Sequence, residues 1–122
     1  VNAEHPDIIC ITEVDPKVSL TNVVDASINL SGYNMFRSMS GRGCIIYTAY
    51  HLLATELHMK TQFETSVWCN IMLSKQNNII IGTIYRSPNS TAENNSLLLN
   101  ILKEAINTKH DHIIINGDFN LK

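Results

Sequence analysis

The stretch VWCNIMLSKQNNIIIGTIY, residues 67–85, decides the fold expected of this chain. Two runs with strong β patterns, 67–73 and 79–85, flank the polar and turn-prone segment 74–78. Two such runs around a short polar connection are typical of an antiparallel β-hairpin. We therefore expect a sheet organised around these two strands.

Apolar runs elsewhere in the sequence predict further strands around this hairpin. The run at 8–12 is continuous and β-branched, which is typical of a strand buried on both faces. Most of 14–32 is expected to be loop, and the glycine-containing segment 38–43 is expected to be a turn or hairpin connection. The remaining strands are expected at residues 33–37, 44–48, 52–59 and 112–116.

A helix is expected between the second hairpin strand and the last strand. Ser90 and Glu93 have the spacing of a capping box, in which two side chains bond backbone N–H groups at a helix start. The apolar residues that follow have helical spacing and would form one face against the sheet: Leu98, Ile101, Leu102, Ala105 and Ile106. The order of elements predicts one α/β (α+β) domain over residues 1–122, with a mixed, mostly antiparallel sheet.

Composition and charge limit the classes of protein to which the chain can belong. A length of 122 residues with 44% hydrophobic and 16% charged residues is typical of a soluble globular domain. The formal charge of -2, without a basic block, argues against a protein that binds nucleic acid mainly through a basic surface. It does not exclude a nuclease, because a bound divalent cation can supply the positive charge that meets a phosphate.

Cysteine usage and hydropathy favour an intracellular, unsecreted protein. Cys10, Cys44 and Cys69 are odd in number and widely spaced, as is typical of buried free thiols rather than of a disulfide framework or a zinc site. The sequence has no apolar run of about 20 residues that could cross a membrane, and its N-terminus has no signal-peptide pattern.

Polar and acidic residues follow three of the expected strands directly. Glu13 follows the first strand, Tyr85 and Arg86 end the hairpin, and Asp118 and Asn120 follow the last strand. A sheet can present such positions together at one edge, where carboxylate and amide oxygens suit Mg²⁺. Mg²⁺ polarises a phosphoryl group while a nearby carboxylate orients or deprotonates the attacking water, so the pattern indicates phosphodiester hydrolysis.

Each of these positions also has an ordinary structural explanation. A glutamate such as Glu13 at a strand end is usually a solvated surface acid. The sequence GDFN at 117–120 readily forms an Asx-type turn, because Asp and Asn bond their own backbone. Tyr85 would ordinarily be an amphipathic strand residue at the edge of the core. His110 and His112 have ligand-like spacing but no second cluster, which favours strand-entry residues over metal ligands.

Five stretches of the sequence form an ordered series of motifs. They are PDIICITE (6–13), GYNMFR (32–37), GRGCIIY (41–47), IIGTIYRSPNS (80–90) and IIINGDFN (113–120). In these stretches and their order the chain resembles the endonucleases of non-LTR (LINE-type) retrotransposons, a branch of the endonuclease/exonuclease/phosphatase superfamily. The resemblance covers nearly the whole chain and implies a four-layer α/β sandwich with two facing sheets, of which this chain would be a part.

The resemblance implies a role for each matched residue. Glu13 and Asp118 would bind the metal, either Mg²⁺ or Mn²⁺, and Asp118 would also position or activate water. The catalytic residues would be Asp118, Asn120 and Tyr85. The substrate phosphate would be held by Tyr85, Arg86, Asn89 and Asn120. The loop has one more residue before its proline than related repair endonucleases have, which leaves the placement of Arg86 and Asn89 open.

Partners and location also follow from the resemblance. The substrate would be DNA, nicked in the nucleus to leave a 3′-hydroxyl that primes reverse transcription, with no membrane involved. A reverse transcriptase domain would follow in the parent chain. Relatives place an asparagine-bearing strand before the position of Val1, and a further aspartate and a serine-aspartate-histidine element after that of Lys122. We therefore expect a parent that cleaves phosphodiesters, and a truncated fragment with little or no activity.

Three alternatives remain open on the sequence. The chain could belong to an inositol-phosphate phosphatase or sphingomyelinase branch of the same superfamily, or it could be a non-catalytic binding remnant. It could also be a generic α/β domain with chance motifs. The nuclease hypothesis requires that the side chains at 13, 85, 118 and 120 converge on one pocket.

Overall fold

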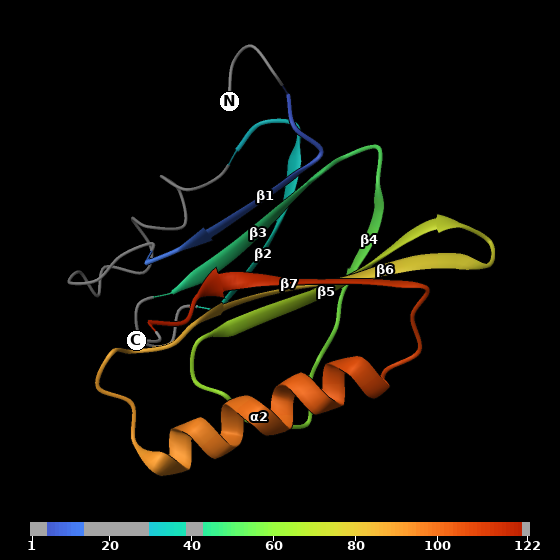
Figure 1. Cartoon of the computed structure of the whole chain (residues 1–122). Coiled ribbons are helices and arrows are strands. Elements are labelled where there is room, and N and C mark those ends of the chain that lie inside the picture. Colours follow the sequence, from blue (N-terminus) through green and yellow to red (C-terminus); the bar gives the residue numbers. More distant parts are fainter. Residues whose placement is uncertain (1–4, 14–29, 39–42, 121–122) are drawn as a thin grey trace.

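The computed structural model describes residues 5–13, 30–38 and 43–120, which form two β-sheets and a helix (Figure 1). The first sheet has the strand order β1-β3-β2 and the second has the order β4-β5-β6-β7. In chain order the elements are β1 Ile8–Thr12, β2 Tyr33–Ser38, β3 Cys44–Ala49, β4 Leu53–Glu56, β5 Ser66–Ser74, β6 Asn77–Tyr85, α2 Ala92–Asn107 and β7 His112–Asp118. The loop and turn expected within 14–29 and 39–42 lie outside the described residues.

The predicted hairpin is present and antiparallel, but its turn is shorter than the sequence suggested. The ladder between β5 and β6 continues to both sides of residues 75–76, which alone form the turn. Asn78 lies in the ladder, where its Nδ2 donates to Asn70 Oδ1 on β5 over 2.6 Å. The turn predicted at 74–78 was therefore too long, because polar side chains that pair across strands stabilise strand structure at its end.

The last strand, β7, extends the second sheet in parallel to β6. Its register places Ile81 opposite Ile114 and Tyr85 opposite Asp118. Two parallel strands need a crossover connection, which α2 supplies. The strand predicted at 112–116 is thus confirmed and extends two residues further, so that Asp118 is its last residue.

Helix α2 packs on the second sheet, as predicted, with two corrections. Thr91 rather than Ser90 is the N-cap, since Thr91 Oγ1 accepts from Asn94 N over 3.0 Å. Ser90 Oγ instead donates to the carbonyl of Ser87 in the preceding turn. Leu98, Ile101 and Ala105 are buried, whereas Ile106 is 58% exposed. The buried face is therefore narrower than the sequence pattern indicated.

The core has two apolar layers on opposite faces of the second sheet. Cys44, Ile46, Val67, Cys69, Ile71, Ile81 and Tyr85 fill the space between the two sheets. Phe63, Trp68, Ile80, Ile84, Leu98, Ile101 and Ala105 lie between the second sheet and α2. These layers follow from the alternation of side chains along each strand. The predicted α+β class with mixed, mostly antiparallel sheets is confirmed.

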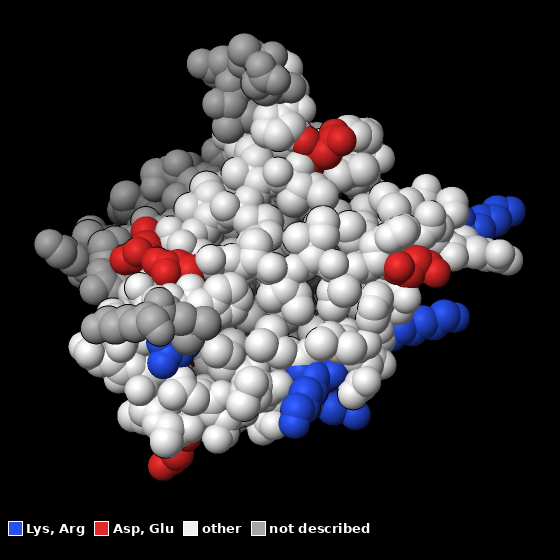
Figure 2. All heavy atoms as spheres, viewed as in Figure 1, with Lys and Arg blue, Asp and Glu red and all other residues white. Residues whose placement is uncertain are grey.

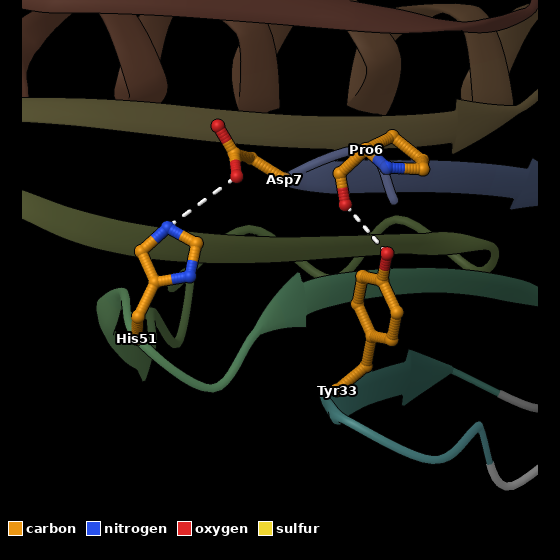
Figure 3. A network of polar contacts seen from close by, with 4 residues as sticks. All are labelled: Pro6, Asp7, Tyr33 and His51. Atoms are coloured by element: carbon orange, nitrogen blue, oxygen red, sulfur yellow. Dashed lines mark hydrogen bonds and ion pairs between the residues drawn. The ribbon is translucent and has the colours of Figure 1, made fainter. Parts of the chain in front are cut away.

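The first sheet is fastened at the beginning of β1 by two polar contacts (Figure 3). Tyr33 Oη donates to the Pro6 carbonyl over 2.6 Å, and His51 Nε2 lies 3.4 Å from Asp7 Oδ1. The edge of the Tyr33 ring also meets the Tyr47 ring, with the centroids 6.4 Å apart. These contacts lie at the end of β1 opposite to Thr12.

All three cysteines are free thiols, as predicted. Cys44 and Cys69 are buried between the sheets, and this burial raises the pKa of each thiol to about 12. Cys10 is half-buried. Within the described parts of the chain, no helix has the length and apolar character required to cross a bilayer.

A buried hydroxyl on β3 leads to the first prediction. Thr48 is fully buried, and in the described structure its Oγ1 has no hydrogen-bond partner. A desolvated hydroxyl without a partner costs roughly 1–3 kcal/mol. Thr48→Val is therefore expected to raise the free energy of unfolding by about 1 kcal/mol in urea denaturation. The matched control is Thr83→Val, which removes a bond from Thr83 Oγ1 to Asn116 Oδ1 of 3.0 Å. A loss of stability in both variants would contradict the prediction.

A carboxylate on α2 leads to a second prediction, about pH. Glu104 accepts hydrogen bonds from the backbone N–H groups of Lys60 (2.6 Å) and Thr61 (2.8 Å), and these bonds lower its pKa. Glu104 is more acidic in the folded chain than in the unfolded chain. Its contribution to the free energy of unfolding is therefore complete at pH values above its pKa in the unfolded chain. It is lost as the pH falls through the folded pKa. We expect Glu104→Gln to destabilise the protein at neutral pH and to match the wild type in acid, measured by denaturation across pH. The exposed Glu64→Gln should show no such pH dependence.

Candidate active site

The carboxyl ends of β1, β6 and β7 meet at one edge of the two-sheet structure (Figure 1). A groove of about 550 Å³ opens there between β1 of the first sheet and β6 and β7 of the second. The residues that line it are Ile8, Cys10, Thr12, Ile81, Thr83, Ile114, Asn116, Gly117 and Asp118. The groove therefore has an apolar floor and a polar end, where Thr12 and Asp118 face it from opposite sheets.

Four groove residues with polar atoms, Cys10, Thr12, Thr83 and Asn116, were not among the predicted site residues. Thr83 Oγ1 donates to Asn116 Oδ1 over 3.0 Å, and Asn116 Nδ2 donates to Cys10 Sγ over 3.5 Å. This chain of bonds joins the two sheets across the groove. Strand alternation carries the missing signal, because Asn116 and Thr83 lie two residues before Asp118 and Tyr85 and so share their face.

Asp118 is half-buried, and its carboxylate lies at the polar end of the groove. Its Oδ1 accepts from the Asn120 N–H over 3.2 Å, which is the Asx-type turn that the sequence also allowed. Asp118 thus holds its own turn and lines the groove at once. Among the described residues, Oδ2 has no protein partner and is available to a ligand.

Gly117 makes this placement of Asp118 possible. Its φ is +142°, and a Cβ added there would lie 1.9 Å from the carbonyl oxygen of Ile84 on β6. Only glycine fits so close to a neighbouring backbone in this conformation. The close approach lets β7 stay paired with β6 up to Asp118.

Tyr85 and Asn89 occupy different surroundings. Tyr85 stands beside Asp118 in the β6–β7 register, but its side chain is 8% exposed and belongs to the core between the sheets. Asn89 is exposed in the turn before α2, where its N–H donates to Ser87 Oγ over 3.4 Å. The structure pairs Tyr85 with Asp118 in the backbone register, and neither Tyr85 nor Asn89 is among the residues that line the groove. Their roles toward phosphate stay predictions.

Arg86 and Asn120 are hydrogen-bonded to each other and to the turn at residues 118–120. Arg86 N donates to the Asp118 carbonyl over 2.8 Å, and Asn120 Nδ2 donates to the Arg86 carbonyl over 2.5 Å. The Arg86 guanidinium donates to the carbonyls of Phe119 and Asn120. Asn120 has a φ of +49°, which asparagine tolerates better than most residues. The guanidinium is thus engaged with the protein backbone.

Glu13 follows Thr12 directly, at the β1 side of the same edge. It is exposed and has a φ of +53°, a left-handed conformation that is costly for a residue other than glycine. Such strain is often found where function constrains the backbone. Figure 2 shows acidic side chains gathered over the edge where β1 and β7 end in Figure 1.

Carboxylates, the ligand type that hard divalent cations prefer, are present at this edge (Figure 2). The described residues contain no group of three His, Cys, Asp or Glu side chains that could hold a metal by themselves. Mg²⁺ is commonly bound through one or two carboxylates and keeps several waters. Asp118 would supply a carboxylate from the groove wall, with Thr12 and Asn116 also in the lining, whereas Glu13 is not among the lining residues.

Comparison with known proteins agrees with the two-sheet fold. The chain belongs to the Endonuclease/Exonuclease/phosphatase family, whose model matches residues 1–122. Members of this family are phosphoesterases and nucleases that generally use divalent metals. No curated protein sequence matches the chain.

A similar solved structure is the crystal structure of humanized D. rerio TDP2 by 14 mutations. The two structures superpose with a TM-score of 0.61 at 19% sequence identity, over 96% of this chain and 50% of that chain. This likeness supports the fold. The chain spans about half the length of the structure that it matches.

Proposed function

We propose that this chain forms part of a phosphodiesterase dependent on Mg²⁺ or Mn²⁺, which nicks DNA in a LINE-type retrotransposon protein. The observation that carries the proposal is the groove itself. Asp118 lines one wall, and Thr12, which directly precedes Glu13, lines the other. Asp118 is the carboxylate that lines the groove, and Glu13 is the next residue after Thr12 at the same edge; a carboxylate of this kind suits a divalent cation that meets a phosphate.

In this proposal each residue at the site has its own role in phosphodiester cleavage. A bound divalent metal would polarise the phosphoryl group and offset its developing charge. Asp118, with one carboxylate oxygen held by the Asn120 N–H, orients the attacking water and accepts its proton through the other oxygen. Asn116 and Thr83, already bonded to each other, extend the polar wall. Tyr85, which pairs with Asp118 in the β6–β7 register, is proposed to contact the phosphate through its hydroxyl.

The choice of a retrotransposon endonuclease rests on the ordered motifs at 6–13, 80–90 and 113–120. In that case the substrate is DNA in the nucleus, and a reverse transcriptase domain follows in the same polypeptide. The nick must then leave a 3′-hydroxyl, because only that end primes DNA synthesis. Since the chain spans about half of the similar structure, cleavage is assigned to the longer protein.

The test is a substrate comparison on the parent protein that contains these 122 residues. Supercoiled plasmid and a phosphoinositide are offered under the same conditions, with Mg²⁺ or with a chelator. We expect metal-dependent nicking that a polymerase can extend, and no release of inorganic phosphate from the lipid. Turnover of phosphoinositide without nicking would reject the nuclease and favour the phosphatase branch. If the protein neither nicks plasmid nor turns over phosphoinositide, the non-catalytic binding protein is the remaining alternative.

The strained backbone at Glu13 gives a prediction that links metal binding to stability. Glu13→Gly removes a carboxylate and relieves a left-handed φ of +53°. We expect Mn²⁺ affinity of this chain to fall at least about tenfold. The free energy of unfolding should stay equal or rise by up to about 1 kcal/mol, because glycine adopts this conformation freely.

The control for Glu13→Gly is Glu56→Gly on β4, an exposed strand position that is not among those with positive φ. Glycine in a strand costs roughly 0.5–1 kcal/mol, so this variant should lose stability and keep its affinity for Mn²⁺. Equal losses of stability in the two variants would show that Glu13 is not strained.

A further inference from the structure

The guanidinium of Arg86 connects the first turn of α2 to the turn that carries Asp118. Arg86 Nε donates to Asn95 Oδ1 over 2.9 Å. Arg86 Nη1 donates to the carbonyls of Phe119 and Asn120, each over 3.1 Å. One planar group thus bonds three acceptors from two elements that lie far apart in sequence.

The backbone of Arg86 holds the same turn from the other side. Its N–H donates to the Asp118 carbonyl over 2.8 Å, and its carbonyl accepts from Asn120 Nδ2 over 2.5 Å. The carbonyls of 118, 119 and 120 are therefore all bonded to one residue. Because Asn120 N also bonds Asp118 Oδ1, any shift of this turn moves the carboxylate.

Asn95 fixes the plane of the guanidinium. It is half-buried on α2, and its Oδ1 accepts the Nε–H, which points away from the end of the side chain. Arginine presents its donors in a rigid fork, so a bond at Nε sets the direction of the remaining N–H groups. Without that acceptor, the fork is free to rotate away from the turn.

We propose that Asn95, acting through Arg86, is a positioning residue for Asp118. In this proposal the Arg86 guanidinium holds the turn at residues 118–120 in place and is not a phosphate ligand. We call this set of hydrogen bonds the bracket. The assignment of a metal to Asp118 rests on the function proposed above, whereas the bracket itself does not. Groups that orient a metal ligand are typically worth 10–100-fold in metal affinity when removed. Asn95 lies on the helix that packs behind the sheet and is not among the residues that line the groove.

The test compares Asn95→Ala with Asn100→Ala in the whole chain. Asn100 is an exposed residue of the same helix, so both variants gain the same helix propensity from alanine. The first readout is Mn²⁺ affinity by electron paramagnetic resonance. We expect a loss of at least about tenfold in Asn95→Ala and none in Asn100→Ala. Asn95→Asp should restore the affinity, because a carboxylate still accepts from Nε.

The second readout needs no metal. Amide hydrogen exchange at residues 117–120 should speed up at least about tenfold in Asn95→Ala, while exchange in β5 and β6 stays at the wild-type rate. Unchanged exchange at 117–120 would overturn the bracket. An equal acceleration throughout the chain would also overturn it, since a role in overall stability alone would then suffice.

The two proposals fail in different ways. If the wild type binds no Mn²⁺, or binds it equally after Asp118→Asn, the proposed function fails and the exchange experiment still decides the bracket. If Asn95→Ala changes neither Mn²⁺ affinity nor exchange, the bracket fails alone. Should Arg86→Gln lower DNA affinity and reduce its salt dependence by about one ion with Mn²⁺ binding unchanged, Arg86 is a phosphate ligand and the inference is wrong.

Discussion

Asp118→Asn is expected to remove Mn²⁺ binding from this chain and to lower nicking by the parent protein roughly a thousandfold or more. Asparagine has the shape of aspartate. Its Oδ1 can therefore still accept the hydrogen bond that Asp118 Oδ1 now accepts from the Asn120 N–H over 3.2 Å. The substitution therefore removes the charge and the proton acceptor while it keeps the turn. A thousandfold loss corresponds to about 4 kcal/mol of transition-state stabilisation.

The measurements are Mn²⁺ titration of the chain and initial rates of plasmid nicking by the parent. The matched control is Asp7→Asn at the other end of β1, where Asp7 is exposed and meets His51 (Figure 3). Surface pairs of this kind contribute about 0–1 kcal/mol, so this variant should bind Mn²⁺ and cleave like the wild type. Full activity of Asp118→Asn would remove Asp118 from the mechanism.

Gly117→Ala is expected to destabilise the fold by about 3 kcal/mol or more. Two costs add at this position. The backbone φ of +142° is one that alanine rarely adopts, and the new Cβ would lie 1.9 Å from the carbonyl oxygen of Ile84. Backbone cannot yield as a flexible side chain can, so β7 must separate from β6 next to Asp118.

Gly32→Ala separates these two costs. Gly32 has a φ of +89°, but nothing lies within 4 Å of the position that its Cβ would take. This variant should lose only about 1 kcal/mol, from backbone strain alone. Both variants are measured by urea denaturation, and Mn²⁺ affinity should fall in Gly117→Ala and not in Gly32→Ala. Equal losses of stability would show that the contact with Ile84 relaxes at no cost.

The strands and the edge at which they end were predictable because both follow from short-range patterns. The run at 8–12 and the second hairpin strand are rich in β-branched residues, and turn-forming residues bound the last strand. The β6–β7 register that places Tyr85 beside Asp118 also follows the expected alternation of strand, helix and strand. Short-range sequence patterns thus predicted the edge at which β1, β6 and β7 end.

Details that depend on partners distant in sequence were not predictable. The direction of the Arg86 side chain is set by Asn95 and by carbonyls more than thirty residues away, as in the bond to Phe119 at a separation of 33. Ile106 has the spacing of a core residue, yet α2 presents a narrower face to the sheet, and it stays exposed. In the sequence, Asn116 and Thr83 have the pattern of ordinary strand residues. They become groove residues only because β1, from the other sheet, lies opposite them.

The groove also dictates when the site can exist during protein synthesis. Its walls are joined by the contact from Asn116 Nδ2 to Cys10 Sγ, two residues separated by 106 positions. At roughly 5–20 residues per second, a ribosome needs on the order of 5–20 s to make the second wall after the first. Throughout that interval the apolar inner side of β1 has no β7 to cover it, so the nascent chain exposes apolar surface before the groove can form.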